Sequence, residues 1–184
     1  MKKVLVFITD GTEEVEVFTP VDFLRRAGVH VDLVAGKDSK KVQLSHGVYA
    51  GADLAIDEIK DMDYDALYIP GGIPGATNLR DNEKVIDLIK KANDQGKLIA
   101  GICAGPIVLE KAGLLKGKDY TCYPGFNEQI QAGNYTNKIV SKDGNILTGK
   151  GPAAAAPLSF LLIEELLGKE KADQIKDQTL FSLL

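Results

Sequence analysis

The chain has 184 residues and a formal net charge of −4 at pH 7, with 22 Lys and Arg against 26 Asp and Glu. An acidic chain with 45% hydrophobic residues is typical of a globular protein and argues against a nucleic-acid binder or a protein of anionic membranes. Its two cysteines, Cys103 and Cys122, give no disulfide framework, which favours a reducing cytoplasmic compartment. Apolar runs stay well below membrane-spanning length, so we expect one soluble domain over residues 1–184.

The first part of the chain has the pattern of a strand–helix–strand unit. Val4–Ile8 is a continuous apolar run that predicts a buried strand, and Asp10 or Thr12 is expected to cap the helix that follows. Pro20 inside the helical pattern predicts a kink or an interruption. Val29–Ala35 is the next predicted strand, and the unit as a whole predicts a parallel sheet.

The rest of the chain continues this alternation, with a small hairpin of residues 42–44 and 48–50 inserted early and a second hairpin at Asp143-Gly144. The other predicted elements are the strand Ala66–Ile69, the helix Asn82–Gln95, the strand Leu98–Ile102, the helix Pro106–Ala112, the strand Tyr120–Tyr123, the small helix Phe126–Ala132, the strands Lys138–Ser141 and Asn145–Thr148, the long helix Gly151–Leu167 and the helix Lys169–Asp177. This order predicts an α/β doubly wound sandwich, with a mostly parallel central sheet and helices on both faces.

Ligands of such sheets bind beyond the carboxyl ends of the strands. Three loops fall there: residues 10–16, residues 70–75 and the corner at Cys103. We expect the three loops to converge on one cleft.

Cys103 lies at the corner between a predicted strand and a predicted helix. Gly101, Ala104 and Gly105 surround it, and such small neighbours permit the sharp turn of a nucleophile elbow. The partial positive charge at the start of the following helix favours the thiolate, the form that attacks carbonyl groups. The alternative is a buried structural cysteine.

Gly71 and Gly72 follow a predicted strand, and their backbone N–H groups are candidates for stabilising an oxyanion opposite Cys103. An ordinary strand-to-helix turn is the alternative. The chain has neither a Gly-x-Gly-x-x-Gly pattern nor a Walker pattern, so nucleotide binding has little support.

Both histidines, His30 and His46, precede Cys103, and their positions suggest neither a cysteine–histidine couple nor a zinc site. A carboxyl group must therefore assist the cysteine if it is catalytic. Glu16 lies on the first helix near the expected cleft, although most glutamates on helices are solvated surface charges.

At these positions the sequence resembles the ThiJ/PfpI superfamily, and specifically its DJ-1-like branch. The matching motifs span nearly the whole chain: Glu13-Glu14-Val15-Glu16, Pro20-Val21-Asp22, Arg25-Arg26-Ala27-Gly28, Pro70-Gly71-Gly72, Ile102-Cys103-Ala104-Gly105-Pro106, Asp143-Gly144, Leu147-Thr148 and Gly151-Pro152. The resemblance implies a flavodoxin-like sandwich, usually a homodimer, with a reactive Cys103. It also implies that Glu16 hydrogen-bonds the sulfur and that the N–H groups of Gly72 and Ala104 form an oxyanion pocket.

Several positions depart from related branches. PfpI-type peptidases carry a histidine where this chain has Ala104, and glutamine amidotransferases need a histidine after the cysteine, whereas here none follows His46. Tyr123 stands where many DJ-1-like proteins have a histidine, so we expect it to act only as a hydrogen-bond donor. Lys150 and His46 replace arginines of some relatives, which is expected to alter the anion preference of the pocket.

The resemblance implies a cofactor-independent and metal-independent glyoxalase or deglycase. Its substrates would be methylglyoxal, glyoxal or early glycation adducts of side chains, with Cys103 as nucleophile and Glu16 as proton shuttle. One alternative is an oxidative-stress sensor or redox-gated chaperone, in which Cys103 stops at sulfinic acid beside Glu16. Another is a dimeric scaffold with a vestigial pocket.

Overall fold

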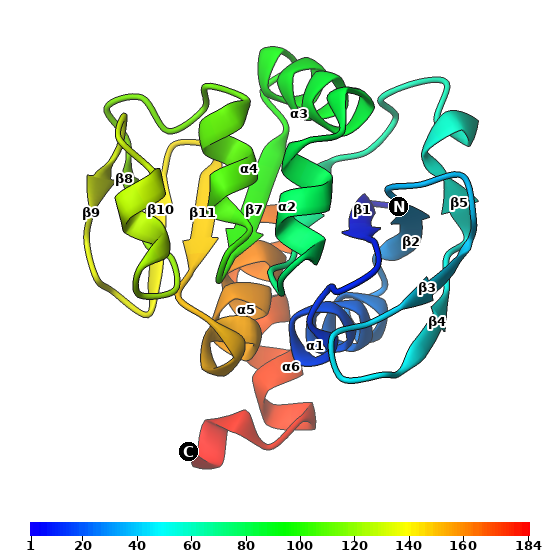
Figure 1. The fold of residues 1–184 in the computed structure, drawn as a ribbon. Coiled ribbons are helices and arrows are strands. Elements are labelled where there is room, and N and C mark those ends of the chain that lie inside the picture. The colour runs from blue at the N-terminus through cyan, green and yellow to red at the C-terminus, as the bar shows by residue number, and fades with distance from the viewer.

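The computed structural model describes residues 1–184, and a seven-stranded sheet forms its centre (Figure 1). The strand order is β10-β11-β7-β6-β1-β2-β5, and every neighbouring pair is parallel except β10 with β11. The strands are β1 (Lys3–Ile8), β2 (His30–Ala35), β5 (Leu54–Ala55), β6 (Ala66–Ile69), β7 (Leu98–Ile102), β10 (Val140–Asp143) and β11 (Ile146–Gly149). The predicted doubly wound, mostly parallel sheet is therefore confirmed.

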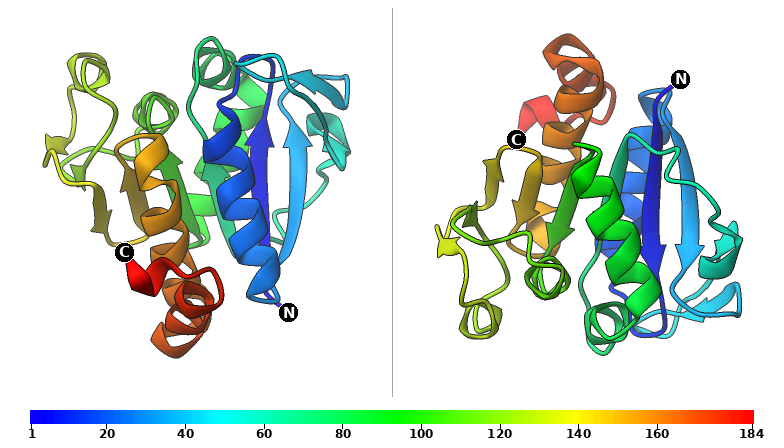
Figure 2. Two further views of the ribbon diagram at one scale, coloured as in Figure 1. Left: turned by 90° about the horizontal axis from the view of Figure 1, so that it is seen from below. Right: turned by 90° about the horizontal axis from the view of Figure 1, so that it is seen from above.

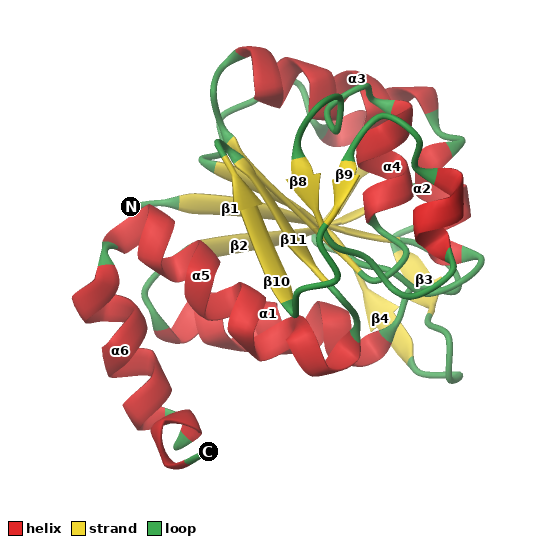
Figure 3. Ribbon diagram, turned by 90° about the vertical axis from the view of Figure 1, so that its left-hand side faces the viewer, coloured by secondary structure: helices red, strands yellow, loops and turns green.

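Helices cover both faces of the sheet (Figures 2 and 3). One face carries α1 (Glu14–Arg26), α5 (Ala155–Leu167) and α6 (Lys169–Gln178), and the other carries α2 (Gly75–Arg80), α3 (Glu83–Asp94) and α4 (Pro106–Lys111). Side chains of β1 alternate between the two cores, with Val4 and Val6 on the α1 side and Leu5 and Phe7 on the α3 side. Burial on both faces explains why the central strands are continuous apolar runs.

Smaller elements surround the sheet. They are the hairpin β3 (Lys41–Gln43) and β4 (Tyr49–Gly51), the pair β8 (Asp119–Tyr120) and β9 (Asn134–Tyr135), and four 3₁₀ turns: η1 (Ile56–Glu58), η2 (Phe126–Gln129), η3 (Pro152–Ala154) and η4 (Phe181–Leu183). Both predicted hairpins are confirmed. The helix predicted over residues 126–132 is only a 3₁₀ turn, the strand predicted over residues 120–123 ends at Tyr120, and α2 was not predicted. None of the helices combines the length and the apolar character needed to cross a membrane.

The start of α1 differs from the sequence prediction. Its N-cap is Glu13, whose Oε2 accepts the Glu16 N–H at 2.8 Å, whereas Thr12 Oγ1 accepts the N–H of Thr9. Asp10 accepts the N–H of Gln43 on the neighbouring hairpin. The helix also continues through the buried Pro20, because its apolar face packs against α5 and tertiary packing outweighs the missing hydrogen bond.

A close approach of three chain segments fixes the corner at Cys103. A Cβ atom on Gly105 would lie 2.5 Å from the carbonyl oxygen of Ile69 on β6 and 2.8 Å from that of Ile102 on β7. Gly105 has helical dihedral angles (φ −51°, ψ −36°), so it is needed for space and not for conformational freedom. The absence of its side chain lets α4 begin directly against the ends of two central strands.

We therefore predict that Gly105→Ala lowers the free energy of unfolding by about 1–3 kcal/mol or more, since the strand carbonyls cannot retreat without breaking the sheet. Gly51→Ala is the matched control, because nothing lies within 4 Å of a Cβ atom there. We expect the control to stay within about 0.5 kcal/mol of the wild type. Urea unfolding followed by circular dichroism measures both, and equal effects would contradict this account of the corner.

Candidate active site

The three loops expected to converge do so at the carboxyl ends of β1, β6 and β7 (Figure 1). The N–H of Glu13 donates to the carbonyl of Gly71 at 3.1 Å, and the N–H of Gly71 donates to the Glu16 carboxyl at 2.8 Å. Cys103 is joined to β11 by a 2.9 Å bond from its N–H to the carbonyl of Gly149. The structure therefore brings Cys103, Glu16 and the two glycines into one site.

Cys103 occupies a strained backbone position. Its φ is 60°, in the left-handed region that a residue with a side chain seldom adopts and that costs about 1–3 kcal/mol. Its own hydrogen bonds hold it there, because its carbonyl also accepts the N–H of Tyr123 at 3.0 Å. This conformation is that of a nucleophile elbow, and the side chain remains partly accessible.

Glu16 is fully buried on the first turn of α1. Its Oε2 accepts the N–H of Gly71, while its Oε1 has no well-aligned hydrogen-bond donor. Burial raises the pKa of this carboxyl to about 7, against a smaller lowering by the Cys103 thiol and the Gly71 N–H. Glu16 is thus a carboxyl group that gains or loses its proton near neutral pH.

Burial also raises the pKa of the Cys103 thiol, and the negative charge of Glu16 raises it further. Hydrogen bonds from the N–H groups of Ala104 and Gly72 to the sulfur lower it, but these are the smaller contributions. Burial and the charge of Glu16 therefore outweigh the expected influence of the helix start, which favours the thiolate. Cys103 and Glu16 form a coupled pair, and the sulfur is best able to ionise when the carboxyl holds the proton and no longer repels a second negative charge.

Neither glycine of the β6 loop can carry a side chain. A Cβ atom on Gly71 would lie 2.7 Å from the Cys103 Cβ and 2.8 Å from both the Ala104 nitrogen and Glu16 Oε2. Gly72 has a φ of 85°, and a Cβ atom there would lie 2.4 Å from the carbonyl oxygen of Gly11. Bare backbone at these two positions leaves room for the N–H groups of Gly72 and Ala104 beside the sulfur.

Tyr123 and Lys150 line a shallow hollow of about 220 Å³ together with Ile139 and Pro152. Tyr123 is about half exposed, and its backbone N–H donates to the carbonyl of Cys103, although Cys103 itself does not line the hollow. Lys150 donates through its Nζ to the side chain of Asn137. The hollow offers an apolar surface with one cation at its edge.

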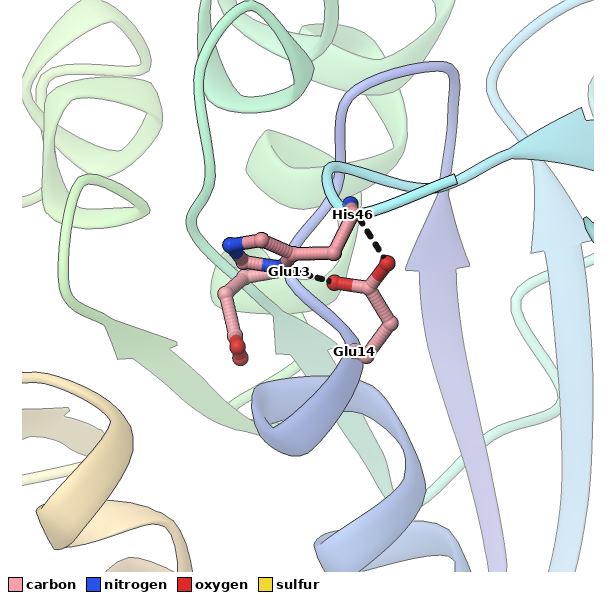
Figure 4. A group of neighbouring side chains, drawn as sticks. All are labelled: Glu13, Glu14 and His46. Atoms are coloured by element: carbon pink, nitrogen blue, oxygen red, sulfur yellow. Dashed lines mark hydrogen bonds and ion pairs between the residues drawn. The ribbon is translucent and has the colours of Figure 1, made fainter. Parts of the chain in front are cut away.

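His46 does not reach the cysteine. It lies in the β3–β4 hairpin, where its Nδ1 is 2.7 Å from one oxygen of Glu14 and its N–H donates to the other oxygen at 2.6 Å (Figure 4). Hydrogen bonding to Glu14 raises the pKa of His46. Glu13 lies close enough for its carboxylate to share a cation with these two residues, but its Oε2 already caps α1. The contact between Glu14 and His46 thus holds the hairpin against the start of α1.

A further buried residue near this site, Tyr68 on β6, is not predicted by the sequence. This side chain is fully buried, and its hydroxyl has no hydrogen-bond partner. Burial and the nearby charges of Glu16 and Cys103 raise the pKa of this hydroxyl well above its ordinary value. The only signal in the sequence is a tyrosine within a run of aliphatic residues, which is also what an ordinary core strand contains.

We predict that the Glu16 carboxyl makes folding stability depend on pH. Its pKa is about 4.5 unfolded and about 7 folded, so the stabilisation is complete below pH 4.5 and is lost as the pH rises through 7. Relative to Glu16→Gln, which stays neutral, the wild type should lose about 3 kcal/mol of unfolding free energy between pH 4 and pH 8.

Urea unfolding across this pH range measures the difference. Glu58→Gln is a control of opposite sign, because hydrogen bonding to the Ala55 N–H lowers the pKa of Glu58 and stabilises the protein above that pKa. A constant difference between the wild type and Glu16→Gln would contradict the buried, neutral carboxyl.

Comparison with known proteins places this site in a family. The model of the DJ-1/PfpI family matches residues 2–165. The Parkinson disease protein 7 homolog of Danio rerio is 36% identical over 179 residues, which cover 95% of each chain. A protein of Pyrococcus abyssi named a deglycase is 36% identical over 152 residues, covering 82% of this chain and 90% of the relative.

Solved structures agree with the sequence matches. Oxidized DJ-1 of Toxoplasma gondii superposes with a TM-score of 0.93 at 40% identity, over 98% of both chains. DJ-1beta of Drosophila melanogaster gives a TM-score of 0.93 at 35% identity, over 97% of both chains. With the fold, the elbow cysteine and these matches in agreement, this chain belongs to the DJ-1/PfpI family.

Proposed function

We propose that this protein is a cofactor-independent glyoxalase or deglycase acting on methylglyoxal, glyoxal or their early adducts with side chains. One observation carries the proposal. The carboxyl of Glu16, whose pKa is about 7, lies beside Cys103, and the backbone N–H groups of Gly72 and Ala104 lower the pKa of the Cys103 thiol. A nucleophile, a proton carrier and an oxyanion site are the three groups that an internal oxidation–reduction of a dicarbonyl requires.

In the first step, Cys103 provides the electron pair that forms the new bond, and Glu16 provides the proton. The Cys103 thiolate adds to the aldehyde carbon of methylglyoxal, and the electron pair of the C=O bond moves to oxygen. That alkoxide lies where the N–H groups of Gly72 and Ala104 stabilise it, and it takes the proton held by Glu16. The result is a neutral hemithioacetal and an ionised Glu16.

Ionised Glu16 then removes the hydrogen of the former aldehyde carbon as a proton, giving an enediolate, and returns that proton to the neighbouring carbon, while the hydroxyl proton of the first carbon moves to the oxygen of the second. The first carbon is oxidised to a thioester while the second is reduced to an alcohol, so no external oxidant or reductant takes part. Water adds to the thioester and the Cys103 thiolate leaves as lactic acid forms; of the two protons set free, one returns to Glu16 and the other goes to solvent, which restores the starting pair and releases lactate. A carboxyl with a pKa of about 7 suits both directions of this transfer.

The hollow lined by Tyr123 and Lys150 has a size that suits a small substrate. Its volume of about 220 Å³ and its apolar lining fit a methyl group or a short side-chain adduct. Tyr123 offers a hydroxyl donor at the half-exposed edge, and Lys150 favours a substrate or product that carries a negative charge. The name of the Pyrococcus abyssi relative, a deglycase, agrees with this substrate class.

We predict that the wild type forms lactate from methylglyoxal without glutathione, and that Cys103→Ser and Glu16→Gln each lower kcat by about a hundredfold or more. Cys122→Ala is the matched control, because Cys122 is fully buried elsewhere in the core and should leave kcat unchanged. Enzymatic measurement of lactate gives the rates. An inactive wild type, or equal activity in all the variants, would overturn the glyoxalase proposal.

A second candidate, a cysteine-based oxidation sensor, is supported by the unequal environments of the two thiols. Cys103 is partly accessible, and the two N–H groups and Glu16 provide hydrogen bonds for the oxygens of a sulfinic acid. Cys122 is fully buried, and burial raises its pKa to about 11. The Toxoplasma gondii relative is itself described as oxidized.

Mild peroxide is therefore predicted to add two oxygen atoms at Cys103 and to leave Cys122 as a thiol. Intact mass and peptide mapping locate the added oxygens. Oxidation confined to Cys122 would eliminate the sensor.

We also propose that the protein acts as a homodimer. Large apolar side chains are exposed on α1 and on the β3–β4 hairpin, which the Glu14–His46 contact holds together; they are Val15, Phe18, Val48 and Tyr49. Exposed apolar side chains gathered on adjoining elements are typical of protein–protein interfaces. A second copy of this chain is the partner that the family resemblance favours.

A further inference from the structure

Two buried polar atoms on the α1 side of the sheet have no hydrogen-bond partner: Glu16 Oε1 and the Tyr68 hydroxyl. A buried polar group without a partner is strongly unfavourable, and folded proteins contain few of them. Phenylalanine would fill the space of Tyr68 without that cost. A tyrosine hydroxyl in this position therefore calls for an explanation.

Tyr68 lies in the same core as Val17, the residue after Glu16, and Cys103 packs against that core. Tyr68 also precedes by three residues the glycine whose N–H binds the other oxygen of Glu16. Ala154 and Ala155 at the start of α5 lie in this core as well, and their methyl groups cannot act as hydrogen-bond partners. The charges that act on the Tyr68 hydroxyl are those of Glu16, Cys103 and Glu13.

We propose that Tyr68 is a positioning residue whose hydroxyl donates to Glu16 Oε1, directly or through one water molecule, when the carboxyl is ionised. The inference rests on the proposed role of Glu16 as proton carrier. In the first step Glu16 passes its proton to the substrate alkoxide, and the carboxylate left behind gains a negative charge in a buried place. Its Oε2 is already bound to the Gly71 N–H, so Oε1 is the oxygen that needs a donor.

The Tyr68 hydroxyl is suited to that role because it remains protonated throughout the working pH range. A donor to the carboxylate stabilises the ionised form and so opposes the effect of burial on Glu16. The other titratable groups acting on Glu16 are Cys103, through its thiol, and Glu13, through its charge. Neither Cys103 nor Glu13 provides a hydrogen-bond donor that stays in place while Glu16 is ionised.

The test measures the rate of Cys103 alkylation by iodoacetamide against pH, which does not require turnover and so stands apart from the proposed function. The wild-type rate should rise with an inflection near pH 7, where the coupled pair loses its first proton. Tyr68→Phe should move this inflection upward by about one pH unit, because the carboxylate loses its donor. Peptide mapping confirms that Cys103 is the residue alkylated.

Two further variants make the outcome decisive. Tyr120→Phe is the matched control, since Tyr120 is a buried tyrosine of the core on the other face of the sheet, and its profile should equal that of the wild type. In a Glu16→Gln background, Tyr68→Phe should have no effect on the profile, because the carboxyl that it serves is gone. An unshifted inflection in Tyr68→Phe, or a shift that persists without the carboxyl, would overturn the proposal.

Discussion

The burial of one carboxyl group is the constraint on which this site depends. Glu16 is held away from water by α1 and the sheet, and its hydrogen bond from Gly71 fixes it against the Cys103 sulfur. Burial raises the pKa of this carboxyl to about 7, whereas an exposed glutamate is already ionised at that pH. The properties of the thiol then follow from the carboxyl, because the two groups repel each other when both are ionised.

Packing around this pair leaves little freedom. The strained backbone of Cys103, the bare glycines of the β6 loop and the close approach at Gly105 all result from bringing two strand ends and two helix starts to one point. Each feature is unfavourable by itself and is maintained by the two cores on either face of the sheet. The packing of the two cores therefore provides the folding free energy that offsets these unfavourable features of the site.

The order of elements was readable from the sequence, because buried parallel strands are short apolar runs separated by helical spacing and turn residues. The elbow at Cys103 could also be predicted, since small residues on both sides of a cysteine permit a sharp turn between a strand and a helix. Sequence patterns favoured Asp10 or Thr12 as the cap of α1, but Asp10 accepts the N–H of Gln43 and Thr12 that of Thr9, and these contacts leave Glu13 as the cap. They also missed α2, a single short helix containing Gly, Thr and Asn, and they overestimated the structure of residues 120–132.

The chemical state of the site was the least predictable part. A helix start beside a cysteine suggests a thiolate, but burial and the charge of Glu16 exceed that influence, and neither can be read from residue order. Tyr68 was hidden for the same reason, since a buried strand position gives no sign of where a hydroxyl points.

The glycines around the sulfur have a consequence for how this protein can diversify. A Cβ atom added to Gly71, Gly72 or Gly105 would lie within 3 Å of neighbouring atoms, so these three positions are closed to residues that carry a side chain. Tyr123 and Lys150 line an open hollow, where side chains can change size and charge without moving the backbone. Sequence changes that alter ligand preference are therefore expected at Tyr123 and Lys150, while the reacting groups Cys103 and Glu16 stay the same.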